Sequence, residues 1–407
     1  MARTTKALTA GRSAGGAPGR VRRRRVLYIH GFDPRGPGPY HAMFAEEAER
    51  AAAVSGTAVE VGPRRRGSEL SAEWTVRSGE VEAGYAFLRW DDRVRARWSK
   101  QELTLLGEVA DWTSEWSRLG TFDLARRQAR ALWFAMISVP ATVGVYILSA
   151  LLVVGLLGFV AGALFHTIGL PYWAGVIPAL LSLFLAPGVW RWLEEKLNVC
   201  WLSRCFTYMR GRARRPSDDL AERDKAFAVA IRDAVADPAW DEVLVVGHSL
   251  GALHAISALA RALEADPKLG DDGRLALLTL GQPICVFTAL PEVERFRREL
   301  SAVTRAARIP WLDVTSPSDP ASACALDPFM HVEAPPPGRF IQRSPRFHVF
   351  LTDEHFKAIR RDPISFHFQY LRAPDKPGGF DYFAFVAGPE RMMDHPWVKA
   401  ARAGGAS

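Results

Sequence analysis

Short apolar runs, many of them rich in β-branched residues, alternate with segments whose apolar positions recur at helical spacing. The runs predict strands, and the segments between them predict helices. The predicted strands are near 58–61 and at 26–29, 83–90, 274–280, 308–314 and, ahead of a glycine-flanked turn, 241–246. The predicted helices include 40–53 and 217–237. Strands separated by helices indicate an α/β fold with a mostly parallel sheet and helices on both faces.

One tract departs from this alternation. Residues 131–190 contain no Asp, Glu, Lys or Arg, and His166 is the only side chain there that can carry a charge. A membrane-spanning helix needs about 20 apolar residues. The tract therefore predicts a transmembrane hairpin with helices at 132–162 and 170–190, the first long enough to tilt. A buried apolar hairpin in a soluble protein is the alternative.

Basic residues lie on both sides of the tract. Four arginines lie between 118 and 130, and seven Lys or Arg residues between 191 and 215. Because cytoplasmic flanks carry an excess of Lys and Arg, both ends of the hairpin are expected in the cytoplasm. The two parts of the soluble region would then lie on one side of the membrane and fold together.

These features divide the chain into five parts. We predict a disordered basic tail at 1–22, an N-terminal domain part at 23–130, the hairpin at 131–192, a C-terminal domain part at 193–396 and a flexible tail at 397–407. The formal charge is +8, but its arginines gather in the tail and beside the apolar tract, and no nucleic-acid motif is recognisable. Anionic lipid headgroups, rather than nucleic acid, are the expected partner.

The four cysteines, at 200, 205, 285 and 324, form no disulfide framework and have no metal-ligand spacing with nearby histidines. We expect a reducing, cytosol-facing location, and neither a metal nor another cofactor.

The clearest chemical motif is Gly247-His248-Ser249-Leu250-Gly251, which follows a predicted strand and precedes a helix rich in small residues. This context is typical of a nucleophile elbow, in which a serine hydroxyl is held at a sharp strand-to-helix turn. The same spelling at 11–15 has neither a strand before it nor a helix after it, so we assign it no function. Ser249 is the candidate nucleophile, and a buried Ser-Gly turn is the alternative.

A second loop could assist such a nucleophile. The strand at 26–29 runs into His30-Gly31-Phe32 and a series of glycines and prolines up to Gly38. In enzymes with a nucleophile elbow, a loop after an early strand supplies one oxyanion donor, so the amides of Phe32 and Leu250 are the candidate pair. A simple strand-to-helix turn is the alternative. Asp91 and Asp92 follow another predicted strand, and we expect them to cap the next segment rather than contact substrate.

An acid and a base should follow the nucleophile along the chain. Asp319 lies in the loop after the 308–314 strand and is the candidate acid; Asp313, inside the apolar run, would need a partner of its own. Apart from His254, five residues beyond the nucleophile, the histidines that follow Ser249 are His331, His348, His355, His367 and His395. Spacing alone does not separate His348, His355 and His367. His248 and His254 are expected to be structural neighbours of the elbow.

The order of these motifs resembles the α/β-hydrolases, and among them the lipase class 3 group. Besides the elbow, Gly281-Gln282-Pro283 matches the G-x-P strand exit of that group, Asp319-Pro320 its acid, and His367-Phe368-Gln369-Tyr370 its terminal H-x-x-Y stretch. Ile284-Cys285 stands where Arg-Val is usual, and the hairpin is an insertion. The resemblance implies an α/β-hydrolase fold and favours His367 as the base.

The expected function is a membrane-anchored serine hydrolase that cleaves a carboxylic ester, lipase-like or esterase-like, through Ser249, His367 and Asp319. The substrate would be an acyl ester or another lipid-like molecule. Two alternatives stay open. One is a non-catalytic membrane adaptor on a hydrolase scaffold, and the other is a thioesterase or acyl hydrolase that acts on a soluble substrate.

Overall fold

The computed structural model describes residues 20–98, 102–197, 199–215, 217–323, 326–332 and 339–403. Most of the predicted N-terminal tail, the last four residues and Cys324 lie outside the described residues. Residues 20–22 do belong to the domain: Val21 is buried, and its amide donates to the Pro389 carbonyl oxygen.

A single sheet organises the domain. Within the described residues it has nine strands, ordered β2-β4-β5-β1-β6-β7-β8-β9, with β3 paired to β4. The run from β5 to β9 is parallel throughout, and only β2, β3 and β4 pair antiparallel. The strands are β1 (Arg23–Ile29), β2 (Glu60–Val61), β3 (Arg65–Arg66), β4 (Ser71–Ser78), β5 (Val81–Leu88), β6 (Glu242–His248), β7 (Leu275–Leu280), β8 (Trp311–Val314) and β9 (Phe340–Arg343). The predicted α/β class with a mostly parallel sheet is confirmed.

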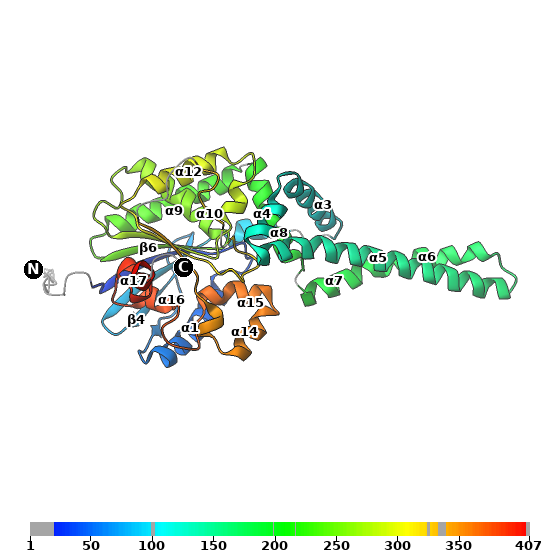
Figure 1. Ribbon diagram of the computed structural model, residues 1–407, viewed down its shortest axis with the longest axis horizontal. Helices are drawn as coiled ribbons and strands as arrows, with labels where there is room; N and C mark the ends of the chain where they lie inside the picture. The colour runs from blue at the N-terminus through cyan, green and yellow to red at the C-terminus, as the bar shows by residue number, and fades with distance from the viewer. Residues whose placement is uncertain are drawn as a thin grey trace, which may run out of the picture.

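Helices cover both faces of the sheet (Figure 1). One face carries α9 (Asp218–Ala236), α10 (Gly251–Ala265), α12 (Glu294–Arg305) and, nearer the hairpin, α3 (Glu102–Arg118), α4 (Thr121–Gln128) and α8 (Val199–Arg214). The other face carries α1 (Pro37–Ser55), α13 (Phe347–Phe350), α15 (Pro363–Phe368), α16 (Tyr382–Ala387) and α17 (Pro396–Ala403). The remaining short helices are α2 (Asp91–Ala96), α11 (Ile284–Thr288) and α14 (Asp353–Arg360).

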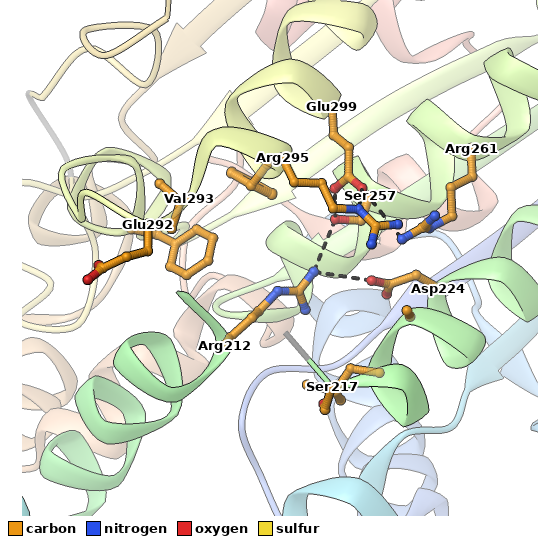
Figure 2. A pocket seen from close by; sticks show the side chains of 13 residues that line it. Arg212, Ser217, Asp224, Ser257, Arg261, Glu292, Val293, Arg295 and Glu299 are labelled. Carbon is orange, nitrogen blue, oxygen red and sulfur yellow. Dashed lines mark hydrogen bonds and ion pairs between the residues drawn. The ribbon is translucent and has the colours of Figure 1, made fainter. Parts of the chain in front are cut away.

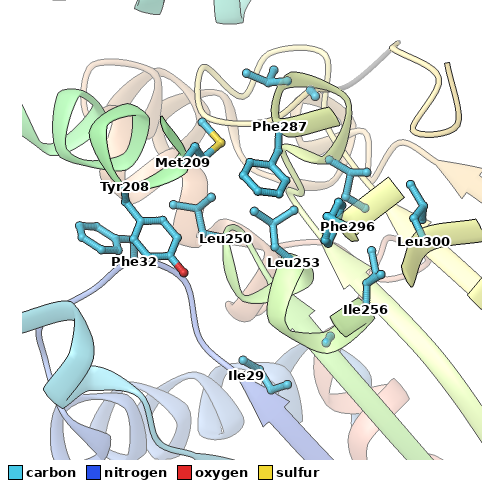
Figure 3. Close-up of a cluster of buried hydrophobic side chains, with 14 of the residues drawn as sticks. Ile29, Phe32, Tyr208, Met209, Leu250, Leu253, Ile256, Phe287, Phe296 and Leu300 are labelled. Atoms are coloured by element: carbon cyan, nitrogen blue, oxygen red, sulfur yellow. The ribbon is translucent and has the colours of Figure 1, made fainter. Parts of the chain in front are cut away.

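Two hydrophobic cores follow from this layering. Side chains alternate along each strand, so Leu27 and Ile29 of β1 enter one core while Val26 and Tyr28 enter the other. Because both faces of the central strands are buried, their sequences are continuous apolar runs rather than alternating patterns. Figure 3 shows the first core around α10, where side chains from β1, α8 and α12 meet.

Two long apolar helical segments project from the domain (Figure 1). α5 (Arg130–Thr167) is one continuous helix of 38 residues, and the returning segment runs through η1 (Tyr172–Gly175), α6 (Val176–Ser182), η2 (Leu183–Leu185) and α7 (Ala186–Leu197). Both segments are long and apolar enough to cross a membrane. Large apolar side chains on them are exposed, among them Leu148 at 68% and Phe184 at 81%.

Small residues let the two segments approach each other closely. A Cβ on Gly158 would lie 3.1 Å from the Ala179 Cβ, and one on Gly162 would lie 2.5 Å from the Tyr172 carbonyl oxygen. Close contact between small residues is a common way for helices to associate in lipid.

A buried ion pair gives a first prediction. The Arg24 side chain is fully buried, donates through Nε to Glu242 at 2.7 Å, and donates to the carbonyl oxygens of Val386, Gly388 and Glu390. Arg24→Met should lower the free energy of unfolding by about 3–5 kcal/mol, because it leaves a buried carboxylate unpaired. Arg77→Met removes the exposed pair with Glu82 and should cost less than about 1 kcal/mol. Urea titration in detergent measures both, and equal losses would contradict the prediction.

Candidate active site

The turn after β6 holds Ser249 in a strained conformation. Ser249 has φ of +56°, one of two positive φ values among the described non-glycine residues. Its amide donates to the Leu280 carbonyl oxygen at 2.8 Å, and α10 begins two residues later. Such backbone strain costs on the order of 1–3 kcal/mol and is found mostly at functional sites.

The glycines on either side of Ser249 are required by close packing. A Cβ on Gly247 would lie 2.6 Å from the Ala252 Cα, and one on Gly251 would overlap the carbonyl groups of Ile29 and His30. The first contact lets the strand turn directly into α10. The second brings the start of α10 against the end of β1, so the two predicted loops meet.

The loop after β1 lies against the serine. A Cβ on Gly31 would be 2.8 Å from the Ser249 Cβ and 3.2 Å from its Oγ. Among the described residues, neither the Phe32 amide nor the Leu250 amide donates a backbone hydrogen bond. Backbone donors that are not used within the fold are available to a ligand.

The buried Phe32 side chain holds this loop in place. Its ring is 4.8 Å from that of Tyr208 and 5.7 Å from that of Trp98, between ring centroids. Leu250 is buried in the same cluster (Figure 3). Burial of both side chains fixes the backbone that carries the two amides.

The structure brings Asp319 and His367 together. Asp319 Oδ2 accepts from His367 Nδ1 at 2.8 Å and from the Tyr370 hydroxyl at 2.9 Å. Both members of the pair are 1% exposed. Gly281, with φ of +56°, makes room for them, since a Cβ there would lie 3.0 Å from His367 Cε1 and 3.2 Å from Asp319 Oδ2.

The other ring nitrogen of His367 makes no hydrogen bond within the part of the chain that the structure describes. His367 Nε2 is buried and has no hydrogen-bond partner among the described residues. Because Nδ1 donates to a carboxylate, Nε2 is left with its lone pair and can accept a proton. The structure therefore contains a histidine with an unused nitrogen, a carboxylate that orients it and a serine on a strained turn, although no hydrogen bond joins Ser249 to His367 among the described residues. Such bonds are often long before substrate binds.

His248 packs against His367 and holds it in place. Its ring stacks on that of His367 at 4.9 Å, and its Nε2 lies 3.1 Å from the His367 carbonyl oxygen. Burial, and then the neighbouring His367, hold the pKa of His248 well below its usual value. A neutral His248 donates to that carbonyl group and adds no charge beside His367.

Asp313 has the partners that a buried carboxylate needs. It accepts hydrogen bonds from the Thr279 hydroxyl at 2.7 Å and from the side-chain amides of Gln282 and Gln342 at 3.1 and 2.9 Å. Burial raises the pKa of Asp313. No histidine is among these partners, which separates it from Asp319.

The other histidines after Ser249 lie in different surroundings. His355 Nδ1 pairs with Asp375 at 2.9 Å in a partly exposed site, and the exposed His348 packs near Phe356. His395 Nδ1 accepts from the Trp397 amide at 3.2 Å. His331 has an unpartnered Nε2 among the described residues, but no carboxylate is seen to orient it.

A second buried Asp–His pair joins α9 and α10. His254 Nδ1 is 2.5 Å from Asp224 Oδ1, and its Nε2 is 2.7 Å from the Tyr208 hydroxyl. Figure 2 shows Arg212 bonded to Asp224 of this pair and to Ser257. Since both nitrogens of His254 are occupied, this pair ties α8, α9 and α10 together and offers no free base.

Asp91 and Asp92 begin α2 and form ion pairs. Asp91 is bound by Arg95 at 2.7 Å and by Arg89 at 3.1 Å, and Asp92 by Arg223 at 2.9 Å. These arginines lower the pKa of both carboxyl groups against the opposing effect of burial.

Among the described residues, no group of three or more His, Cys, Asp or Glu side chains is placed to hold a metal ion. Comparisons with protein families, characterised proteins and solved structures found no match to this chain.

The contact between Gly31 and Ser249 gives a second prediction. Gly31→Ala should lower the free energy of unfolding by about 1–3 kcal/mol, because the new methyl group overpacks against the elbow. Gly38→Ala is the matched control, since nothing lies within 4 Å of a Cβ there, and it should change stability by less than about 0.5 kcal/mol. Thermal unfolding in detergent compares the two; a Gly31→Ala protein as stable as wild type would contradict the prediction.

Proposed function

We propose that this protein is a membrane-anchored serine hydrolase that cleaves a carboxylic ester. The observation that carries the proposal is the buried hydrogen bond of 2.8 Å between Asp319 and His367, which leaves Nε2 of the histidine without a partner among the described residues. Ser249, held at φ of +56°, follows His248, whose ring stacks on that of His367 at 4.9 Å. The chain order Ser, Asp, His and the positions after β6, β8 and β9 are those of an α/β-hydrolase, the fold that we propose here.

The chemistry follows from these groups. The Ser249 Oγ attacks the ester carbonyl carbon while His367 Nε2 takes the hydroxyl proton. The imidazolium, stabilised by Asp319, then gives that proton to the departing alcohol, and an acyl-enzyme remains. Water, deprotonated by the same Nε2, releases the acid and restores the serine.

The oxyanion of each tetrahedral intermediate would accept hydrogen bonds from the Phe32 and Leu250 amides. Removal of one such donor costs on the order of 3 kcal/mol in other hydrolases. Their attachment to buried Phe32 and Leu250 side chains supports this role, because preorganised donors need no rearrangement during the reaction.

The same proposal places α5 and the returning segment in a membrane. The exposure of their apolar side chains and the arginines at both ends favour a hairpin whose catalytic domain and both termini are cytoplasmic. The hairpin would hold the catalytic domain at a lipid surface, where apolar esters collect.

Active-site labelling tests the catalytic proposal. In membranes that contain the full chain, a fluorophosphonate probe should label the wild type, fail to label Ser249→Ala, and label His367→Ala at least about 100-fold more slowly, since the general base is lost.

Two matched variants make this test specific. Ser13→Ala removes the serine of the other G-x-S-x-G sequence, and His355→Ala removes the histidine that pairs with Asp375; both should be labelled like wild type. Equal labelling of wild type and Ser249→Ala would refute the enzyme and favour the adaptor.

Protease protection tests the topology. A C-terminal tag on the chain in sealed vesicles with the cytoplasmic face outward should be digested without detergent. A tag that becomes accessible only after detergent lysis would refute a cytoplasmic domain.

A further inference from the structure

A cavity of about 930 Å³ lies where α5 leaves the domain. This is near the upper end of the range for small-molecule sites, about 300–1,000 Å³. Its walls come from the start of α5, from Trp201 and Leu202 of α8, from the 317–321 loop, and from α13, α14 and α15. Figure 1 shows α14 and α15 on the side of the domain from which the hairpin projects.

One wall is a regular face of α5. Six α5 residues line the cavity, at positions 131, 134, 135, 138, 139 and 142. This spacing of three and four places them on one side of the helix over about three turns. The wall is therefore the first part of the first apolar segment, continuous with the surface that the proposed membrane would cover.

The α5 wall is apolar even where its sequence is polar. The Ser138 hydroxyl donates to the Ala135 carbonyl oxygen at 2.9 Å, and the Thr142 hydroxyl donates to that of Ser138 at 2.7 Å. Both hydroxyls thus use their proton within the helix. Neither hydroxyl therefore needs a hydrogen-bond acceptor in the cavity, so this wall can lie against a hydrocarbon chain.

The opposite wall leads to the candidate catalytic groups. Ser318 and Pro320, on either side of Asp319, line the cavity, and so does Phe366, the residue before His367. Trp201 lines it as well, and its ring centroid is 5.7 Å from that of His367. The cavity thus adjoins the Asp–His pair, with Trp201 beside the base.

Charged and ionisable side chains accompany this apolar space. His348, Arg360 and Asp362 are exposed and line the cavity. The Asp362 carboxylate accepts from the Ile364 and Ser365 amides at the start of α15, whereas the Arg360 guanidinium lies 5.8 Å from the Phe356 ring centroid. An apolar interior with a cation among its exposed residues matches an amphipathic lipid better than a small polar ester.

We propose that this cavity holds the acyl chain of a long-chain ester that enters from the bilayer. The inference rests on the proposed function, and it assigns that site a membrane-resident lipid ester rather than a soluble one. Because α5 forms both a wall of the cavity and the start of the proposed span, a chain could pass from lipid into the cavity without crossing water.

Two substrates for the full-length protein test this proposal. One is 4-methylumbelliferyl palmitate in phosphatidylcholine vesicles, and the other is dissolved 4-methylumbelliferyl butyrate, whose chain is short. Ser138→Phe places a ring in the cavity at an exposed position and should lower the ratio of palmitate to butyrate kcat/KM at least tenfold.

Ser149→Phe is the matched control. Ser149 is also exposed on α5, and eleven residues return nearly to the same face of the helix about 16 Å further along. Its ratio should equal that of wild type. Fluorophosphonate labelling of Ser138→Phe at the wild-type rate would show that its site is folded.

The outcomes separate the two proposals. Butyrate hydrolysis that depends on Ser249, with the same substrate ratio for Ser138→Phe as for wild type, would overturn the cavity assignment and leave the hydrolase. An equal fall in the ratio of palmitate to butyrate kcat/KM for Ser149→Phe and Ser138→Phe would also overturn the cavity assignment. If neither ester is hydrolysed, the proposed function fails and the inference with it.

Discussion

The parallel pairing of β1 with β6 is the constraint on which the rest of the structure depends. Arg24 pairs with Glu242 at one end of this register and Ile29 with Gly247 at the other. The pairing aligns the ends of the two strands, so that the loop at Gly31 contacts Ser249. More than 200 residues separate the strands, and they include α5 and the segment that returns from it. α5 and the returning segment must therefore leave and re-enter the domain without disturbing that register, which a hairpin allows.

Much of the fold could be predicted because the central strands are buried on both faces. Their apolar runs mark β1, β5, β6, β7 and β8 clearly. β4 and β9 were not predicted, for physical reasons. β4 pairs antiparallel and mixes buried with exposed positions in the sequence SAEWTVRS, whereas β9 has only four residues and none is fully buried. Such strands are defined by the neighbouring strands with which they pair, and the local sequence does not show that pairing.

Part of the candidate site could be predicted, because some of its residues lie in a recognisable local sequence. Ser249 is marked by its local context, and Asp319 by its place after a strand. The preference for His367 over His355 came from the resemblance, and spacing alone could not supply it. Each of these histidines has a carboxylate partner, so the contacts that distinguish them are long-range. The stacking of His248 on His367 left no local signal. Gly281, which fits against the Asp–His pair, and Tyr370 lie within the G-x-P and H-x-x-Y stretches, but those motifs do not show what the two residues contact.

The helix that follows the hairpin contacts both halves of the candidate site. Trp201 and Tyr208 are seven residues apart, two turns along one face of α8. The first lies beside His367, and the second packs on Phe32 and bonds to His254 at the base of the elbow helix. A movement of the hairpin relative to the sheet would have to displace α8 against His367 and the loop at Phe32 together. Trp201 is half-buried beside the cavity, but Tyr208 and Phe32 are buried, so the packing at Tyr208 resists such a movement and couples the hairpin to the site through α8.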